Sequence, residues 1–176
     1  MTGYSPTHIP IPKNHADFER KATVLFREIL KDPDAHRLGR EGQLQWGIDI
    51  VGDDGANTSR IVGIQCKKKA PNQVLTAKEV RDEVRKALKY KPAICKYIII
   101  TTAPKDRKLE QLAQTLTQAQ KAKGRKIKIE VWGWDLLEDR IDEYPAARNV
   151  FDPGWSPSVK ETQQSLKQIN QPGFWF

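Results

Sequence analysis

The hydrophobic residues of this chain fall in blocks, and the spacing within each block predicts either a helix or a strand. Apolar residues three and four positions apart line one face of a helix, whereas apolar residues at alternate positions line one face of a strand. Helical spacing occurs in residues 14–31, 76–91, 104–123 and 134–144, and strand patterns occur in residues 46–69, 95–103 and 126–132. The first strand pattern contains the turn sequence DDGANTS, so it predicts a hairpin.

Residues that favour helix ends support these helical segments. Asn14 precedes the first apolar stripe as an N-cap, and the pair Asp32-Pro33 ends that segment. Thr76 and Glu79 have the spacing of a capping box at the start of the second helix. The apolar stripe of the first helix consists of Phe18, Ala22, Leu25, Phe26, Ile29 and Leu30.

The order of these elements predicts the fold class. Strands separated by helices of this length require right-handed crossovers, which favours an α/β domain with a mixed central β-sheet flanked by helices. The segment CKYIIITTA is mostly apolar, as expected for a strand that is covered on both faces. We expect one domain over residues 14–150, an extended N-terminal arm over residues 1–13 and a linker-like C-terminal tail over residues 151–176.

The tail ends in three aromatic residues, Phe174, Trp175 and Phe176. Such a cluster is unusual at the end of a free soluble chain. Either it packs back onto the domain, or it leads to a further domain of a longer polypeptide.

Composition changes this picture mainly through charge. The 176 residues include 30 Lys and Arg against 22 Asp and Glu, and the net charge of +8 favours nucleic acid over an anionic membrane as partner. No apolar run could span a bilayer and no secretion signal is present at the start, so we expect a cytoplasmic protein. Without metal-ligand spacing, His8, His15 and His36 receive no role, and Cys66 and Cys95 are expected to be small core residues.

Candidate chemistry gathers on the predicted hairpin. Asp49 stands between Ile48 and Ile50, and Gln65 and Lys67 alternate with Ile64 and Cys66. A period of two therefore places Asp49, Gln65 and Lys67 on the polar side of the hairpin. Carboxylate and amide oxygens are ligands for Mg²⁺, and a lysine can orient water and offset charge on a phosphate. We expect Asp49 to bind a metal ion and Lys67 to position a water molecule. The side-chain oxygen of Gln65 and the carbonyl of Cys66 are further candidate ligands.

These residues carry a resemblance to a known family. The segments Gly47-Ile48-Asp49-Ile50 and Ile64-Gln65-Cys66-Lys67, with Glu19 beside the stripe of the first helix, resemble the PD-(D/E)XK nuclease superfamily. The likeness is closest to its Mrr-type restriction endonuclease branch, in which Q-x-K replaces D/E-x-K. It implies a restriction endonuclease-like core over residues 15–145, with Glu19, Asp49, Gln65 and Lys67 catalytic. It also implies Mg²⁺ (or Mn²⁺) as cofactor and DNA as substrate.

Each candidate also has an interpretation without function. The alternatives are a strand-end carboxylate for Asp49, an edge amide for Gln65, a solvated lysine run for Lys67 to Lys69, and an exposed helix border for Glu19. Gln43 and Gln45, with Lys68 and Lys69, are candidate contacts to nucleic acid, although the two glutamines are more simply loop caps. Trp132 and Trp134 are expected to pack in the core.

Two functions from different classes remain open. The first is a metal-dependent endonuclease domain that hydrolyses DNA phosphodiester bonds, by family analogy often the N-terminal effector of a larger restriction or antiviral defence protein. The second is a nuclease-fold module that only binds nucleic acid, which the neutral Gln65 favours because an amide is a weaker metal ligand than a carboxylate. Cutting both strands of a duplex usually requires two active sites, so we expect a homo-oligomer.

Overall fold

A computed structural model describes residues 8–39, 46–55 and 57–155 of the chain. Five strands form one sheet in the order of the sequence: β1 (His36–Arg37), β2 (Ile50–Asp54), β3 (Asn57–Lys67), β4 (Lys96–Thr101) and β5 (Lys128–Trp132). The pairs β1·β2 and β2·β3 are antiparallel, whereas β3·β4 and β4·β5 are parallel. The prediction of a mixed sheet is therefore confirmed.

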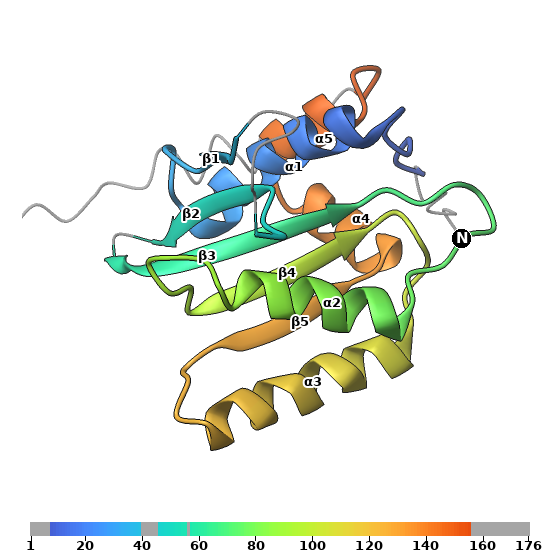
Figure 1. Ribbon diagram of the computed structural model, residues 1–176. Helices are drawn as coiled ribbons and strands as arrows, with labels where there is room; N and C mark the ends of the chain where they lie inside the picture. Colours follow the sequence, from blue (N-terminus) through green and yellow to red (C-terminus); the bar gives the residue numbers. More distant parts are fainter. Residues whose placement is uncertain (1–7, 40–45, 56, 156–176) are drawn as a thin grey trace, which may run out of the picture.

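Helices cover both faces of this sheet (Figure 1). They are α1 (His15–Leu30), α2 (Ala77–Ala87), α3 (Arg107–Ala122), α4 (Trp134–Asp142) and α5 (Pro145–Phe151). One face packs against α2 and α3, and the other packs against α1, α4 and α5. The α/β fold class with helices flanking a mixed sheet is thus confirmed.

The sequence pattern does not predict the last helix, α5, because a proline directly after a helical segment usually ends the helix. Proline is well tolerated at the first position of a helix, and Pro145 begins α5. Phe151 at the end of α5 is fully buried, so core packing extends one residue past the predicted domain end at residue 150. The division of the chain into arm, domain and tail stays a prediction, since residues 156–176 lie outside the described ranges.

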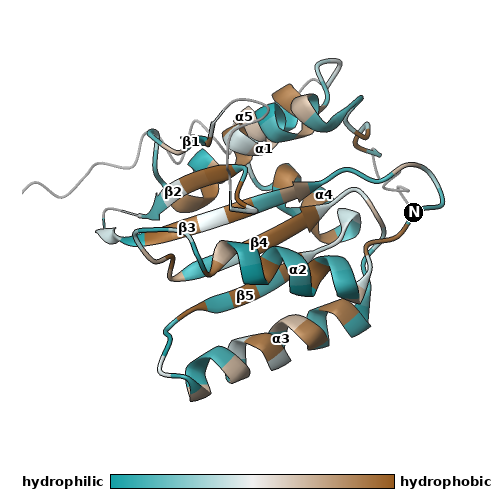
Figure 2. Cartoon of the chain, in the orientation of Figure 1, coloured by the Kyte–Doolittle hydropathy of each residue, from teal (hydrophilic) through white to brown (hydrophobic). Residues whose placement is uncertain are grey.

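The core lies in two layers, one on each side of β4. Ile98 and Ile100 of β4 pack into the cluster that contains α1, while Tyr97 and Ile99 pack into the cluster that contains α2 and α3. All four side chains are buried, so β4 is covered on both faces as predicted. Its later part is hydrophobic in Figure 2.

The predicted helix caps are present. The Asn14 side chain accepts a hydrogen bond of 2.8 Å from the Asp17 N–H at the start of α1. Thr76 and Glu79 form both hydrogen bonds of a capping box at the start of α2. These caps fix where α1 and α2 begin, and both helices contribute side chains to the site described below.

The segment before α1 is in contact with the domain. Residues 8–13 have no helix or strand, as expected for an arm, yet Ile9 is only 1% exposed. The N–H of Ile9 donates a hydrogen bond of 3.1 Å to Glu138 on α4. In the described ranges no helix combines the length and the apolar character needed to cross a membrane.

Candidate active site

The backbone before β2 differs from the predicted hairpin. β2 begins only at Ile50, and Trp46 and Gly47 have the positive φ values 51° and 65°. Ile48 packs into the cluster with α2 and α3, whereas Ile50 packs into the cluster with α1. Alternation therefore fails at Asp49, because Ile48 and Ile50 lie on opposite faces of the sheet. The prediction holds on β3, where alternate residues pack under α1.

Asp49 is nevertheless joined closely to β3. Its Oδ2 atom accepts hydrogen bonds of 2.7 Å from both the Cys66 N–H and the Gln65 side-chain amide. Asp49 is only 4% exposed. The Gln65 side chain thus faces Asp49 with its nitrogen, while its buried Oε1 atom has no hydrogen-bond partner among the described residues. The structure brings Asp49, Gln65 and Cys66 together as predicted.

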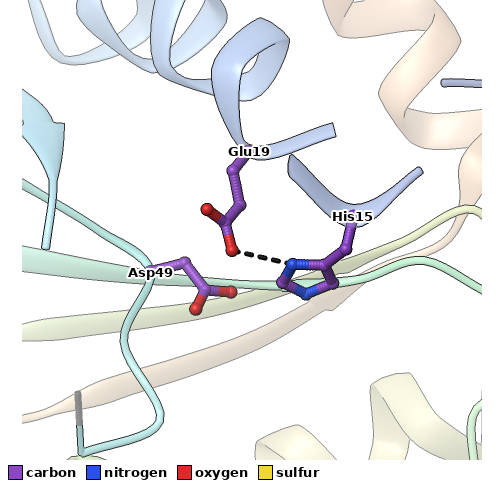
Figure 3. Close-up of side chains that lie close together, drawn as sticks. All are labelled: His15, Glu19 and Asp49. Atoms are coloured by element: carbon purple, nitrogen blue, oxygen red, sulfur yellow. Dashed lines mark ion pairs between the residues drawn. The ribbon is translucent and has the colours of Figure 1, made fainter. Parts of the chain in front are cut away.

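Helix α1 brings two further groups to this place. Glu19 lies one helical turn after His15, so both side chains project from the same face of the helix. The Nδ1 atom of His15 lies 2.8 Å from Glu19 Oε1, and its Nε2 atom lies 2.9 Å from the carbonyl oxygen of Cys66. One ligand atom from each of His15, Glu19 and Asp49 lies within 4.8 Å of the others. Figure 3 shows the three side chains converging from α1 and the loop before β2.

The sequence pattern did not indicate His15. Of the two carboxylates nearby along the chain, Asp17 and Glu19, only Glu19 lies on the same face of the helix, and one such pair does not define a metal site. The spacing of four residues between His15 and Glu19 on a predicted helix was the available signal. Cys66, the other partner, is 51 residues away and becomes a neighbour only through folding.

Lys67 contacts α2 and does not contact Asp49. Its Nζ atom lies 2.8 Å from Oε1 of Glu83, which also accepts from Lys86 at 3.1 Å. The Glu83 side chain is 8% exposed and Lys67 is 24% exposed. Glu83 was also missed, although a carboxylate beside the apolar residues Val80 and Val84 of a helix was a visible signal. Lys67 is therefore held by a partner on the opposite side of the sheet from α1.

The glycine before Asp49 fits against this ion pair. A Cβ atom on Gly47 would lie 2.6 Å from Oε2 of Glu83. The carbonyl of Gly47 accepts a hydrogen bond from the buried Tyr97 hydroxyl. The loop that positions Asp49 is thus packed directly against the residue that holds Lys67.

Burial is the largest influence on the pKa values of Asp49 and Cys66 in the candidate site. It raises the pKa of Asp49 from 3.8 to about 6. The Cys66 N–H lowers that pKa by hydrogen bonding, the nearby Glu19 carboxylate raises it, and His15 and Lys67 lower it. Burial also raises the pKa of the Cys66 thiol well above its usual value, so its sulfur stays a protonated core atom.

The other predicted contacts have mixed outcomes. Lys68 and Lys69 line a pocket with Thr102 and Trp134 at the ends of β3 and β4, and Lys69 also forms an ion pair with Glu79. Trp132 and Trp134 are buried, which confirms that they pack in the core. Gln43 and Gln45 lie outside the described residues.

Comparison with known proteins supports a nuclease. A family model described as a restriction endonuclease, Mrr_cat_2, matches residues 19–143. The chain belongs to this restriction endonuclease family, and the resemblance to the PD-(D/E)XK superfamily is confirmed. None of the curated proteins matches the chain.

One solved structure adds a weak likeness in fold. It is the MspJI restriction endonuclease in complex with a 27-mer oligonucleotide, with 16% sequence identity and a TM-score of 0.47. The match covers 90% of this chain and 32% of the MspJI chain. The described chain thus spans about a third of that protein.

The donor atoms around Asp49 fit a divalent cation. One ligand atom from each of Asp49, Glu19 and His15 lies within 4.8 Å of the others, and the carbonyl oxygen of Cys66 lies 2.9 Å from the His15 ring. The unpartnered Oε1 of Gln65, buried among the described residues, is a further oxygen that a cation could satisfy. Hard oxygen donors of this kind are the ligands that Mg²⁺ and Mn²⁺ bind.

Proposed function

We propose that this chain is a metal-dependent endonuclease domain that hydrolyses DNA phosphodiester bonds. The observation that carries the proposal is the buried carboxylate of Asp49, held by Gln65 and Cys66 beside Glu19 in a restriction endonuclease fold. Mg²⁺ (or Mn²⁺) is the proposed cofactor. A divalent cation at this place would supply positive charge that stabilises the negative charge developing on the phosphate.

The residues of the chain have separate roles in this proposal. Asp49 and Glu19 bind the cation, with the Gln65 oxygen and the Cys66 carbonyl as auxiliary ligands. Lys67 orients the attacking water and faces the phosphate with its positive charge. Glu83 fixes the end of Lys67 through the 2.8 Å ion pair. For Gln65 to serve as an oxygen ligand, its amide group must turn over from the orientation that faces Asp49.

The net charge of +8 supports DNA as the partner. Lys68 and Lys69, next to Lys67 at the end of β3, are proposed contacts to the phosphate backbone. We also propose that the protein acts in the cytoplasm as an effector of restriction or antiviral defence. In this proposal it works as a homo-oligomer and as the N-terminal domain of a larger protein.

The test is cleavage of plasmid DNA by purified protein with Mg²⁺ or Mn²⁺. We expect cleavage that disappears in EDTA and falls by at least about a hundredfold in Asp49→Ala and Lys67→Ala. Asp53→Ala removes a partly buried carboxylate in β2 outside the candidate site. It serves as the matched control and should cut normally. Folded Asp49→Ala protein that cuts as fast as the parent chain would show that the assignment is wrong.

Gln65 favours a second candidate, a module that binds nucleic acid without cutting it. A neutral amide at this position gives a weaker cation site than a carboxylate. Calorimetry separates the two candidates. Steeply salt-dependent DNA binding, with no uptake of Mg²⁺ or Mn²⁺ in the presence of DNA, would favour the module over the nuclease.

A further inference from the structure

The imidazole of His15 is placed where no packing requirement explains it. Its side chain is 51% exposed, yet both of its ring nitrogens face oxygen atoms of the candidate site. Nδ1 faces the Glu19 carboxylate at 2.8 Å, and Nε2 faces the carbonyl oxygen of Cys66 at 2.9 Å. Both of these oxygens are proposed ligands. The ring therefore lies among the atoms that would surround a cation.

We propose that His15 is a nitrogen ligand of this metal site, and that the site therefore prefers a transition-metal cation such as Mn²⁺ to Mg²⁺. This inference rests on the proposed function and adds to it the identity of the ion. The proposed ligand, the imidazole of His15, comes from the first turn of α1 and lies outside the hairpin motif.

The geometry fits a shared ion. Two ligands on opposite sides of one ion, each at about 2.1 Å, are about 4.2 Å apart. One ligand atom from each of His15, Glu19 and Asp49 lies within 4.8 Å of the other two. A small side-chain rotation would therefore bring these atoms to the separation of about 4.2 Å that one shared ion allows. His15 and Glu19 are the side chains free to adjust, because Asp49 is fixed by two hydrogen bonds to β3.

A second observation concerns Gln65. Its buried Oε1 atom has no hydrogen-bond partner in the part of the chain that the structure describes, while its Nε2 atom faces Asp49. Buried polar atoms are almost always satisfied. Turning the amide over would bring Oε1 to the Asp49 carboxylate, where a cation could satisfy both oxygens.

The donor set decides between the metals. Mg²⁺ prefers an octahedron of oxygen ligands and keeps much of its water, whereas imidazole nitrogen is a good ligand for transition metals. Mn²⁺ accepts carboxylate and carbonyl oxygens as readily as Mg²⁺ does, and it gains from the nitrogen. A site with one imidazole and several oxygens is thus expected to bind Mn²⁺ more tightly.

The experiment measures metal binding by the full chain without DNA, so it does not depend on cleavage. Binding of Mn²⁺ is followed by calorimetry and by the electron paramagnetic resonance of free Mn²⁺, and Mg²⁺ is measured by competition. We expect Mn²⁺ to bind the parent chain at least about tenfold more tightly than Mg²⁺. His15→Ala should lose at least about tenfold in Mn²⁺ affinity and less than about threefold in Mg²⁺ affinity.

A spectroscopic signature tests the ligand directly. Pulsed electron paramagnetic resonance of bound Mn²⁺ should show coupling to a nitrogen nucleus in the parent chain and lose it in His15→Ala. His36→Ala is the matched control, because this exposed histidine on β1 faces the carbonyl of Asp34. The substitution should leave the nitrogen coupling and the Mn²⁺ affinity unchanged. Thermal unfolding of metal-free His15→Ala shows whether α1 remains folded.

The outcomes separate this inference from the proposed function. Nitrogen coupling that persists in His15→Ala overturns the ligand assignment, and so does an equal loss of Mn²⁺ and Mg²⁺ affinity, which would indicate that His15 only orients Glu19. If the parent chain cuts DNA with a metal and His15→Ala is unchanged in binding, the nuclease proposal survives and the His15 proposal fails. If the parent chain binds neither metal without DNA, the His15 proposal fails, and the cleavage assay alone decides the nuclease proposal.

Discussion

At the scale of single residues, Asp49 combines a proposed metal-binding role with an electrostatic cost to stability. Its pKa in the folded protein is about 6 against 3.8 in an unfolded chain, because the carboxyl group is buried. Well below pH 3.8 the group is protonated in both states. As pH rises from 3.8 to about 6, the unfolded chain releases this proton while the folded state keeps it, so stability is lost over this range and stays lower above it. The loss at pH 7.5 is up to about 3 kcal/mol.

We therefore expect Asp49→Asn to stabilise the metal-free protein while abolishing cleavage. Both hydrogen bonds to Asp49 go to one oxygen, which the asparagine carbonyl oxygen can replace. The free energy of unfolding of Asp49→Asn should exceed that of the parent by about 1–3 kcal/mol at pH 7.5, and by much less at pH 4. Urea denaturation in EDTA at both pH values measures this. A variant that is less stable than the parent at pH 7.5 contradicts the argument.

Glu83 offers a second test at this scale. Removing its negative charge leaves Lys67 and Lys86 without their shared partner. We expect Glu83→Gln to lower stability by about 1–2 kcal/mol, since the pair is only partly buried. If Glu83 positions Lys67 for the proposed reaction, kcat should fall by about tenfold with little change in KM.

The control for Glu83 is its neighbour on α2. Asp82→Asn removes an exposed carboxylate that pairs with Lys78 and Arg85, and it should leave kcat unchanged. Plasmid cleavage at saturating and limiting DNA separates kcat from KM. A purely structural role for Glu83 predicts lower stability with kcat intact, which would contradict the positioning role.

The residues of the candidate site differ in how far sequence predicts them. Asp49, Gln65 and Lys67 carry a motif that is local to one hairpin, so their types and spacing were visible. His15 and Glu83 were not found, because each acquires its role from a partner in another element. Lys67 was expected near Asp49, but its contact with Glu83 depends on how α2 packs, which the hairpin pattern does not contain.

At the scale of elements, the loop before β2 links the positions of Asp49 and Lys67, because it carries Asp49 and packs against Glu83, the partner of Lys67. Gly47 has a left-handed φ of 65°, and a Cβ atom there would crowd Glu83 at 2.6 Å. Gly55 has a similar φ of 67°, but a Cβ atom there would lie 4.0 Å from the Leu30 carbonyl oxygen, the nearest atom it would meet among the described residues. The two glycines thus share the backbone conformation and differ in crowding.

Substitution by alanine separates these two effects. Gly55→Ala should lower the free energy of unfolding by about 1 kcal/mol through backbone strain alone. Gly47→Ala should lower it by about 2 kcal/mol or more, and should also reduce cleavage, because Glu83 must move away from Lys67. Urea denaturation and plasmid cleavage of both variants measure this. Equal effects of the two substitutions would show that crowding against Glu83 is unimportant.

Periodicity predicted the regular elements well and the irregular ones poorly. The apolar stripe of α1 and the fully apolar β4 follow from patterns that repeat over many residues. The two residues of β1 are too few to show a period, and α5 was hidden by a proline that begins a helix. Alternation around Asp49 misled because that residue precedes the strand, where the backbone turns at Trp46 and Gly47.

At the scale of the whole molecule, the candidate site draws on both faces of the sheet. α1 approaches from one face with His15 and Glu19, and α2 approaches from the other with Glu83. β3 passes between them and contributes Gln65, Cys66 and Lys67. The site therefore forms only when the helices pack on both faces of the sheet. The order of the elements was predictable from local patterns, but the contacts of the site residues depend on this packing and were not.

The N-terminal segment is part of this packing. It was predicted to be an arm, yet Ile9 is 1% exposed in the core cluster beside α1, while Ile11 two residues later is 48% exposed. The two isoleucines form a matched pair within one segment. They allow the contribution of this contact to be measured without deleting any part of the chain.

We expect Ile9→Ala to lower the free energy of unfolding by about 2–4 kcal/mol, because it removes buried methyl groups and leaves a cavity. Ile11→Ala should change it by less than about 0.5 kcal/mol. Urea denaturation of both variants at one pH measures the difference. Since Ile9 packs in the same cluster as Phe18 and Ala22 of α1, Ile9→Ala should also loosen the helix that presents Glu19. Hydrogen exchange of α1 amides should therefore quicken in Ile9→Ala and stay unchanged in Ile11→Ala, and equal stability of the two variants would mean that the segment is an arm after all.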